Sequence, residues 1–511
     1  MSTPATETST HTPAASPGPS PWIFAAIIAT GIALRLGLYL RNRALWLDEA
    51  FLALNIVRRD FHGLAQSLEF RQGAPLAYLW ATKAFALLWG PHEYGLRAVP
   101  LIAGIAAFIG IYYLGRRVVD RASLLTALGI CAVSFPLIRY ASEVKQYSLD
   151  VLAAVAISYC GVLCVDRAAR WQKFALLATV AAVSPWFSHA SVFVIAGVLA
   201  TLAVHSLIRK QTGRMLLLGL PSAVWGLSFA ASFALVLRHT AEDDVVRSWW
   251  LSAYLPRPIV SPSALKWILW SVTDLFEDPV GLVLPGLGAI AFMIGALTLF
   301  KSRPVALALL LSPIGFAFLG AALQRYPFTG RFLLFAVPGI ALVIGAGAVT
   351  LANLLWARSR AASVLFLLIL FVQPALLAVN AVLDPPRAGM RPVIETLRTE
   401  RADGEPLYVY HWAQFEFLYY AELMGYEPGE MQAGVTSRND WSYYRGEIEN
   451  FRGRGRVWFV FSSVEPKLGE GEEQYFLTTL DELGQRVEEH WWKDARLYCY
   501  ALDGPASSET R

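Results

Sequence analysis

The chain has 511 residues, of which 56% are hydrophobic and 16% are charged, and its net charge is +4. A soluble protein carries about 25% charged residues, and a run of about 20 apolar residues is long enough to cross a bilayer. The composition therefore excludes an ordinary soluble protein, favours a multi-pass membrane protein, and gives no reason to expect nucleic acid as a partner.

The chain begins with a polar tail and continues with apolar runs. Residues 1–21 are rich in Ser, Thr and Pro and lack a basic start. We therefore expect a disordered tail rather than a cleaved signal peptide. Apolar length predicts about 11 transmembrane spans, near residues 22–40, 96–115, 122–138, 148–165, 174–188, 191–208, 215–237, 280–300, 304–322, 331–355 and 361–382.

Five short loops between these spans are basic, and they alternate with loops that are not. They hold Arg116, Arg117 and Arg121; Arg167, Arg170 and Lys173; Arg209, Lys210 and Arg214; Lys301 and Arg303; Arg358 and Arg360. Because positive loops stay in the cytoplasm, this pattern predicts which end of the bundle is cytoplasmic. The four cysteines include no Cys-x-x-Cys pair, which argues against a disulfide framework or a thiolate zinc site.

Residues 74–89 decide on which side the first loop lies. This segment is apolar but short, and Lys83 lies in its middle. If it spans the membrane, Asp48 faces the cytoplasm; if it lies along the interface, Asp48 faces outward. The charge rule permits both arrangements, whereas length and Lys83 favour an interfacial helix. We therefore expect Asp48 outside, together with the loops around Glu143 and Tyr326.

The composition changes again at Asp384, where charged residues and turn signals return. We expect two regions after the tail: a transmembrane region over 22–383 and a small extracytoplasmic α/β domain over 384–511. In this second region, 406–410, 457–461 and 496–502 are predicted strands, and 411–424 is a predicted helix.

Asp48 and Glu49 follow the first span directly. Asp48 could simply cap a helix over 49–57, with Glu49 in its first turn. Alternatively, Asp48 is a general base that accepts the proton of an attacking hydroxyl group. Glu49 would then orient it or share a divalent cation with it. Carboxylates at the end of a membrane helix are costly, which favours function.

Two further loops on the Asp48 side carry candidate residues. The loop Arg139–Asp150 contains Glu143, Lys145 and Tyr147, of which Glu143 is hardest to explain as an interface anchor. The other loop holds Arg325, Tyr326 and Arg331 around a Pro/Gly turn. Arginines outside the membrane oppose the charge rule, and a phosphate ligand would explain them.

The long outer loop 238–278 is also polar and charged, but its individual residues carry a weaker signal. It contains Glu242, Asp243, Asp244, Arg247, Trp249, Trp250, Lys266, Asp274, Glu277 and Asp278. His189 stands alone between two spans, and such a residue is more often packed or capping than a ligand. The spacing of the histidines does not predict a metal site.

Several segments together resemble a known family. They are the Asp-Glu pair, FRQGAPLAYLW at 70–80, GPHEYGLRAVP at 90–100, a span ending in LGRR, RYASEVKQYSLD at 139–150 and YPFTGRFLLFAVPG at 326–339. They resemble the GT-C membrane glycosyltransferases, family 39 in the broad sense, which include protein O-mannosyltransferase-like and lipid A aminoarabinose transferase-like proteins. The C-terminal region resembles no family that we can name.

The resemblance implies roles for individual residues. Asp48 matches the acidic residue taken as the catalytic base, and Glu49 matches a second acidic position of the mannosyltransferase-like members. The aminoarabinose transferases have a phosphate-binding lysine where this chain has Ala74. Binding of the donor phosphate or of substrate is then expected from other residues of the candidate loops, namely Arg71, Gln72, Glu143, Lys145, Tyr147, Arg325, Tyr326 and Arg331.

The expected fold is an all-α GT-C bundle with juxtamembrane helices and a C-terminal α/β domain. The expected function is inverting transfer of a sugar from a polyprenyl-phosphate donor to a glycan, lipid or protein hydroxyl, at the outer face of a bacterial inner membrane. No cofactor is certain, and a divalent cation is left open. The alternatives are a lipid-linked sugar flippase or transporter and a non-catalytic glycan-assembly protein.

Overall fold

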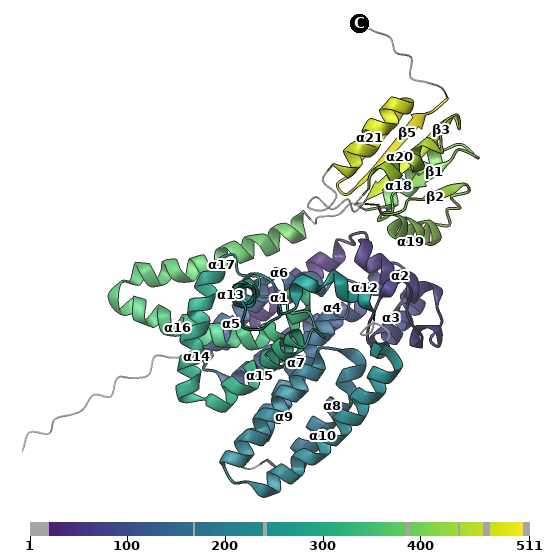
Figure 1. The fold of residues 1–511 in the computed structure, drawn as a ribbon. Helices are drawn as coiled ribbons and strands as arrows, with labels where there is room; N and C mark the ends of the chain where they lie inside the picture. Colours follow the sequence, from purple (N-terminus) through teal and green to yellow (C-terminus); the bar gives the residue numbers. More distant parts are fainter. Residues whose placement is uncertain are drawn as a thin grey trace, which may run out of the picture.

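The computed structural model describes residues 20–166, 169–238, 243–384, 389–437, 440–462 and 471–503. Most of the predicted tail, residues 1–19, lies outside these ranges, as do Arg167 and Glu242. The first helix begins at Pro21. Figure 1 shows a bundle of helices with a small sheet domain above one end.

The described residues contain nine helices that are long and apolar enough to cross a membrane. They are α1 (Pro21–Leu40), α4 (Glu93–Val118), α7 (Tyr147–Val165), α9 (Ser191–Ile208), α10 with the turn after it (Thr212–Leu237), α14 (Pro285–Ser302), α15 (Pro304–Ala322), α16 with the turn before it (Gly330–Arg358) and α17 (Arg360–Leu383). The chain is thus an integral, multi-pass membrane protein.

Two more predicted spans form helices of the same bundle that fall below span length. They are α5 (Arg121–Val133) and α8 (Trp171–Phe187). Helix α5 packs against α16, and α8 packs against α10 and α7. All 11 predicted runs therefore contain a bundle helix. The run 122–138 is broken at Ser134, where α6 (Phe135–Tyr140) begins.

Contacts between loops join four of the five basic loops in two pairs. Arg303 donates a hydrogen bond to the Arg117 carbonyl at 3.2 Å, and Arg214 donates one to the Val165 carbonyl at 3.2 Å. These contacts join the ends of helices that the alternation of positive charge assigns to one side. The sheet domain and the first loop lie at the other end (Figure 1).

The first loop contains two short helices, α2 (Leu47–Arg58) and α3 (Leu76–Trp89). The 14 residues of α3 span about 21 Å, which is less than the apolar core of a bilayer, about 30 Å thick. The Lys83 ammonium group donates to the Val57 carbonyl at 3.0 Å, so it lies against the end of α2. This length and contact agree with a helix that does not cross the membrane.

The C-terminal residues form a five-stranded sheet with order β2-β1-β3-β5-β4. Its strands are β1 (Leu407–Val409), β2 (Met431–Ala433), β3 (Arg456–Ser462), β4 (Gln485–Trp491) and β5 (Ala495–Ala501). The helices are α18 (Arg391–Glu400), α19 (Gln414–Met424), α20 (Ser442–Glu449) and α21 (Glu472–Leu483). Strand β1 is parallel to β2 and β3, while β5 is antiparallel to β3 and β4.

The three predicted strands correspond to β1, β3 and β5, which are largely buried. The sequence interpretation missed β2, which has three residues, and β4, which alternates between exposed and half-buried positions. An edge strand with one wet face and many charged side chains does not resemble a buried apolar run. The missed strands are the two edges of the sheet.

Helix α19 docks the sheet domain on the first loop. The Tyr420 hydroxyl accepts a hydrogen bond from the Leu45 backbone N–H at 2.8 Å and donates one to the buried Glu93 carboxylate. Arg391 forms an ion pair with the same carboxylate. The Tyr419 hydroxyl donates to the Pro91 carbonyl at 2.7 Å. These bonds hold the sheet domain over the end of the bundle that carries the first loop.

Candidate active site

A cavity of about 1800 Å³ lies between the sheet domain and the end of the bundle that carries the first loop. Asp48, Gln72, Lys145, Tyr147 and Arg331 line it, although they come from three separate segments of the chain. Most of the sequence-predicted candidates therefore share one cavity. Glu49 and Glu143 are the two that do not line it.

The Asp48 carboxylate forms two ion pairs, one with Lys145 and one with Arg331. One carboxylate oxygen lies 2.9 Å from the Lys145 Nζ atom, and the other lies 2.5 Å from an Arg331 guanidinium nitrogen. Burial alone would raise the pKa of Asp48, but the charges and hydrogen bonds of Lys145 and Arg331 outweigh it and lower this pKa to about 2. In this state, both oxygens of the carboxylate are engaged by cations.

Asp48 is not the helix cap that its sequence context allowed. Helix α2 begins at Leu47, its N-cap residue is Trp46, and Asp48 lies in its first turn. The side-chain oxygens of Asp48 turn toward Lys145 and Arg331 instead. The capping interpretation is therefore wrong in detail, although a carboxylate in a first helical turn is still favoured by the helix dipole.

Lys145 lies on the turn before α7. Its side chain is 7% exposed, and its ammonium group also donates to the Gln72 side-chain oxygen at 3.0 Å. Burial lowers the pKa of Lys145, and the charge of Asp48 opposes this effect. Gln72 thus orients a lysine that the sequence places 73 positions away.

Arg331 is held by a tight turn and a set of aromatic rings. Its guanidinium carbon lies 5.7 Å from the Tyr147 ring centre and 5.3 Å from that of Trp250. Cations stack favourably on such ring faces. The preceding Gly330 has a φ angle of 38°, and a Cβ atom there would lie 2.8 Å from the Asp278 carboxylate. The turn that places Arg331 beside Asp48 therefore requires glycine at position 330.

Glu49 points away from the cavity into the protein interior. Its carboxylate accepts hydrogen bonds from the Arg97 guanidinium at 2.6 and 2.8 Å and from the Val144 backbone N–H at 2.7 Å. Burial opposes ionisation, but the Arg97 charge lowers the pKa of Glu49 overall. Asp48 and Glu49 therefore do not converge on one point where they could share a cation. Arg97 was not identified from sequence.

Glu143 is also buried, and its carboxylate pairs with the Arg139 guanidinium at 2.7 Å. The pair occupies the turn that presents Lys145 to the cavity. The backbone carbonyl of Glu143 accepts the Lys145 N–H at 2.7 Å. Glu143 thus shapes this turn rather than facing a ligand.

The remaining candidate residues, Arg71, Arg325 and Tyr326, lie around the Asp48 ion pairs, and the two arginines are exposed to solvent. Arg71 forms an ion pair with Asp243 at 2.5 Å. Arg325 is exposed on the cavity wall and has no ion pair within the described ranges. The Tyr326 hydroxyl donates to the Phe332 carbonyl at 2.7 Å, which fixes the turn between them. Arg325 is therefore the cation of this group that is available at the wall.

The cavity has an apolar arm between helices of the bundle. Side chains of α9, α10 with its following turn, and α15 line this arm, namely Phe193, Ala196, Phe229, Phe233, Val236, Leu237, Phe316 and Leu319. In the most apolar stretch of α10 and its following turn, 11% of the residues are buried inside the protein, so the arm lies beside a helix that faces lipid. Such a wall suits a hydrocarbon chain.

The sheet domain closes the cavity from above. It contributes Trp412, Phe415, Ser462 and Arg496, among other residues. The Phe415 ring packs 4.5 Å from the Phe51 ring of α2. The cavity therefore has a charged centre, an apolar arm in the bundle and a mixed aromatic and polar mouth.

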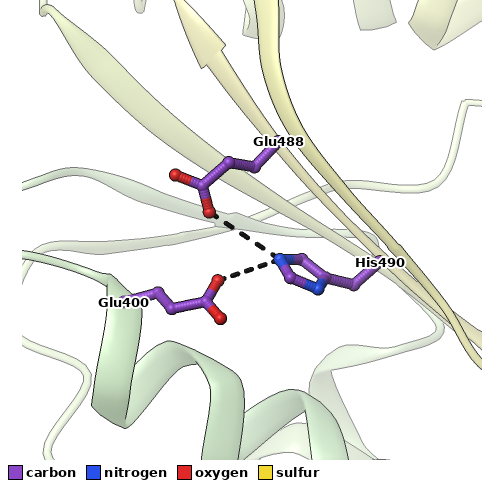
Figure 2. A group of neighbouring side chains, drawn as sticks. All are labelled: Glu400, Glu488 and His490. Carbon is purple, nitrogen blue, oxygen red and sulfur yellow. Dashed lines mark ion pairs between the residues drawn. The ribbon is translucent and has the colours of Figure 1, made fainter.

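A group of side chains of the types that can bind a metal ion lies elsewhere, on the sheet domain. Figure 2 shows Glu400, Glu488 and His490, whose ligand atoms lie within 4.8 Å of one another. The His490 Nε2 atom is 2.9 Å from Glu400 and 3.7 Å from Glu488. None of the three lines the cavity. The group joins α18 to β4 and is separate from the Asp48 centre.

The sequence matches no protein-family profile and no curated protein. The fold does match solved structures. ArnT from Cupriavidus metallidurans in the apo state has a TM-score of 0.57 and 12% identity, over 93% of this chain and 97% of that one. The same protein bound to undecaprenyl phosphate has a TM-score of 0.56 at 12% identity, over 94% and 98% of the two chains.

The oligosaccharyltransferase AglB from Archaeoglobus fulgidus is also similar. Its complex with an inhibitory peptide and a dolichol-phosphate has a TM-score of 0.53 and 11% identity, over 96% of this chain and 75% of that one. The oligosaccharyltransferase from the same organism in complex with Zn and sulfate gives 0.54 at 13% identity, over 93% and 73%. Identities this low show the fold alone, and that fold is the GT-C fold expected from the sequence.

Proposed function

We propose that this chain, whose fold is that of the GT-C membrane glycosyltransferases, transfers a sugar from a polyprenyl-phosphate donor to an acceptor hydroxyl group. The observation that carries the proposal is the cavity itself. It joins the Asp48–Lys145–Arg331 centre to an apolar arm beside a lipid-facing helix. An amphipathic ligand with an anionic head and a hydrocarbon tail fits both parts.

Lys145 and Arg331 bind the donor phosphate in this proposal. Both cations contact Asp48, and a phosphate that approaches them competes with that carboxylate. Guanidinium and ammonium groups are the usual partners of phosphate oxygens. Arg325 at the wall adds a third positive charge. Since Ala74 occupies the lysine position of the aminoarabinose transferases, Lys145 and Arg331 supply the charge from other segments.

Asp48 is the base. When the phosphate draws Lys145 and Arg331 away, the carboxylate loses the partners that lower its pKa, so its basicity rises toward an ordinary value. It then accepts the proton of the acceptor hydroxyl while that oxygen forms a bond to the anomeric carbon. The bond from this carbon to the phosphate oxygen breaks, and its electron pair stays on the polyprenyl phosphate. Attack from the opposite face inverts the configuration.

The leaving phosphate gains negative charge in the transition state. Lys145 and Arg331 are already bound to the phosphate when the donor is in place, so they stabilise the developing charge in the transition state without further reorganisation. Glu49 acts as a positioning residue, because its bonds to Arg97 and to the Val144 N–H join α2 to the turn that carries Lys145. No step requires a nucleotide.

In this proposal the acceptor enters through the mouth below the sheet domain, from the periplasmic or extracellular side. The basic loops at the other end of the bundle support this orientation, because positively charged loops stay in the cytoplasm. A glycan, a lipid or a protein hydroxyl is compatible with it. A transporter would place its working charges near the midplane, whereas the charged centre here lies at one end of the bundle.

Reconstitution tests the proposal. The purified protein in liposomes receives a panel of radiolabelled undecaprenyl-phosphate sugars with glycan, lipid and peptide acceptors, with and without chelator. We expect labelled product with the wild-type protein and none with Asp48→Asn. Translocation of donor without any transferred product would instead favour a flippase, and binding without turnover would favour a non-catalytic assembly protein.

A further inference from the structure

Two polar side chains at the start of α7, that of its N-cap residue Gln146 and that of Asp150 in its first turn, remain unexplained by the Asp48 centre. Gln146 and Asp150 lie four residues apart, and the Asp150 N–H bonds to the Gln146 carbonyl at 3.1 Å. Residues at this spacing lie on the same face of a helix. Both line the cavity. The two residues therefore form a short polar strip in the wall of the cavity that Asp48 also lines.

The polar atoms of this strip have unused hydrogen-bonding capacity. Asp150 is 5% exposed, and its Oδ1 atom has no hydrogen-bond partner in the part of the chain that the structure describes; the same holds for the Gln146 Oε1 atom. The Ser188 side chain and the Ala190 backbone N–H, from the turn before α9, donate hydrogen bonds to the Asp150 carboxyl group, but they leave its Oδ1 atom without a partner. Because buried polar groups are nearly always paired, an acidic side chain in this position calls for a ligand.

His189 completes the group from a different segment. It lines the cavity between α8 and α9, and its Nε2 atom likewise has no partner among the described residues. The carboxylate and the amide oxygen accept hydrogen bonds, and a neutral imidazole nitrogen does so as well. Three such atoms from two sides of one space require a ligand with several O–H or N–H donors.

The strip is adjacent to the proposed phosphate site. Tyr147 follows Gln146 directly, and its ring contacts the Arg331 guanidinium. Asp150 lies one turn further along α7, deeper in the bundle. A group attached to a phosphate held by Arg331 and Lys145 can therefore reach this strip, and the ring of a sugar is such a group.

We propose that Gln146, Asp150 and His189 form a subsite that recognises the transferred sugar through the hydrogen-bond donors of its ring. This inference rests on the proposed function, because it assumes that the ligand phosphate lies at Lys145 and Arg331. The subsite takes hydroxyl groups, or an ammonium group on an amino sugar, and both are O–H or N–H donors. A site that hydrogen-bonds such groups discriminates strongly against ligands that lack them.

Binding of the lipid carrier with and without its sugar tests the phosphate site and the sugar subsite separately. Full-length protein in nanodiscs is titrated with undecaprenyl phosphate and with undecaprenyl phosphate linked to glucose, mannose, galactose or 4-amino-arabinose. We expect at least one sugar-bearing lipid to bind about tenfold or more tightly than the bare carrier, since each well-paired buried group contributes on that scale. The panel member that gains most distinguishes hydroxyl from ammonium recognition.

Asp150→Ala should reduce this sugar-dependent gain to within about twofold while the Kd for undecaprenyl phosphate stays unchanged. Asp150→Asn retains the shape of the side chain and serves if the alanine variant does not fold. His189→Gln probes the subsite from the other segment. Asp403→Ala, an exposed residue in a turn of the sheet domain, is the matched control.

The outcomes distinguish the two proposals. If wild-type protein does not bind undecaprenyl phosphate, the proposed function fails. If the carrier binds but no sugar-bearing lipid binds more tightly, the subsite is overturned. It is also overturned if the variants retain the full sugar-dependent gain, or if they weaken both lipids equally, because the residues then serve only the structure.

Discussion

The Arg331 guanidinium lies 2.5 Å from the Asp48 carboxylate, although 283 positions separate the two residues in the chain. Lys145 binds the other oxygen of the same carboxylate at 2.9 Å. This arrangement carries two positive charges against one negative charge, so it favours a further anion. It is the physical basis for placing a donor phosphate here, and it makes several results predictable.

Asp48→Asn should reduce transfer by about 100- to 10,000-fold, the range by which a positioned general base accelerates a reaction. The amide has nearly the same shape but cannot accept the hydroxyl proton. Turnover of labelled donor is measured in liposomes, and size-exclusion chromatography checks the fold. Asp60→Asn, in the first loop but outside the cavity, is the control. Wild-type turnover in the Asp48 variant would refute its role as base.

Arg331→Ala should weaken binding of undecaprenyl phosphate and lower kcat/KM more than Arg325→Ala does. Arg331 is fixed by Asp48 and by the Tyr147 and Trp250 rings, whereas Arg325 is exposed at the wall. A preorganised cation contributes more than a mobile one. We expect a loss of about 100-fold in kcat/KM for Arg331→Ala and about tenfold or less for Arg325→Ala. Equal effects in the two variants would contradict this ranking.

Glu49→Gln should destabilise the protein rather than act only on catalysis. Glu49 and Arg97 are both buried, with side chains 1% and 2% exposed, and breaking one partner of such a pair costs about 3–5 kcal/mol. Thermal unfolding in detergent measures the loss. Glu69→Gln, whose side chain is 53% exposed beside Arg59, is the control and should change stability by less than about 1 kcal/mol.

The stability difference between wild type and Asp48→Asn should depend on pH. The pKa of Asp48 is lowered to about 2 in the folded protein, against about 3.9 in an unfolded chain. A lowered acid pKa contributes stability that is present above the unfolded value and is lost as pH falls through the folded value. The wild-type advantage, about 2 kcal/mol, should be constant from pH 5 to 7 and disappear between about pH 4 and pH 2. A difference that does not change over this window would show that Asp48 is not ionised in its ion pairs.

Tyr420→Phe should loosen the sheet domain without unfolding the bundle. The hydroxyl group links the Leu45 N–H to the buried Glu93 carboxylate, and removing it leaves both with one fewer partner. The cost is about 1–3 kcal/mol, and it falls on the docking surface of α19. Limited proteolysis should therefore release the sheet domain faster. Tyr443→Phe, on an exposed face of α20, should leave the cleavage rate unchanged.

Local patterns in the sequence were enough to predict much of the fold. Long apolar runs must be helices in a bilayer because no water is present to satisfy their backbone groups, and each predicted run contains a bundle helix. The buried strands β1, β3 and β5 were also visible as apolar runs. The short β2 and the charged β4 were not, because the position of an edge strand depends on the strand next to it.

The separation of Asp48 from Glu49 illustrates what sequence proximity cannot settle. The two carboxylates are neighbours in the chain, and both were candidates for the same chemistry. On a helix, consecutive side chains point about 100° apart, so one faces the cavity and the other faces Arg97. The local sequence does not indicate which face of α2 lines the cavity, because this depends on how α4 and the turn at Val144 pack against the helix.

The sequence by itself determined that this is a multi-pass membrane protein with basic loops at one end and Asp48 as its foremost candidate for chemistry. Only the tertiary structure decided that Lys145 and Arg331 bind Asp48, that Glu49 and Glu143 form internal ion pairs with arginines, and that Gln146, Asp150 and His189 line the same cavity. The physical reason is range: apolar length and charge alternation act locally along the chain, whereas ion pairs and cavity walls form between segments that only the packed bundle brings together.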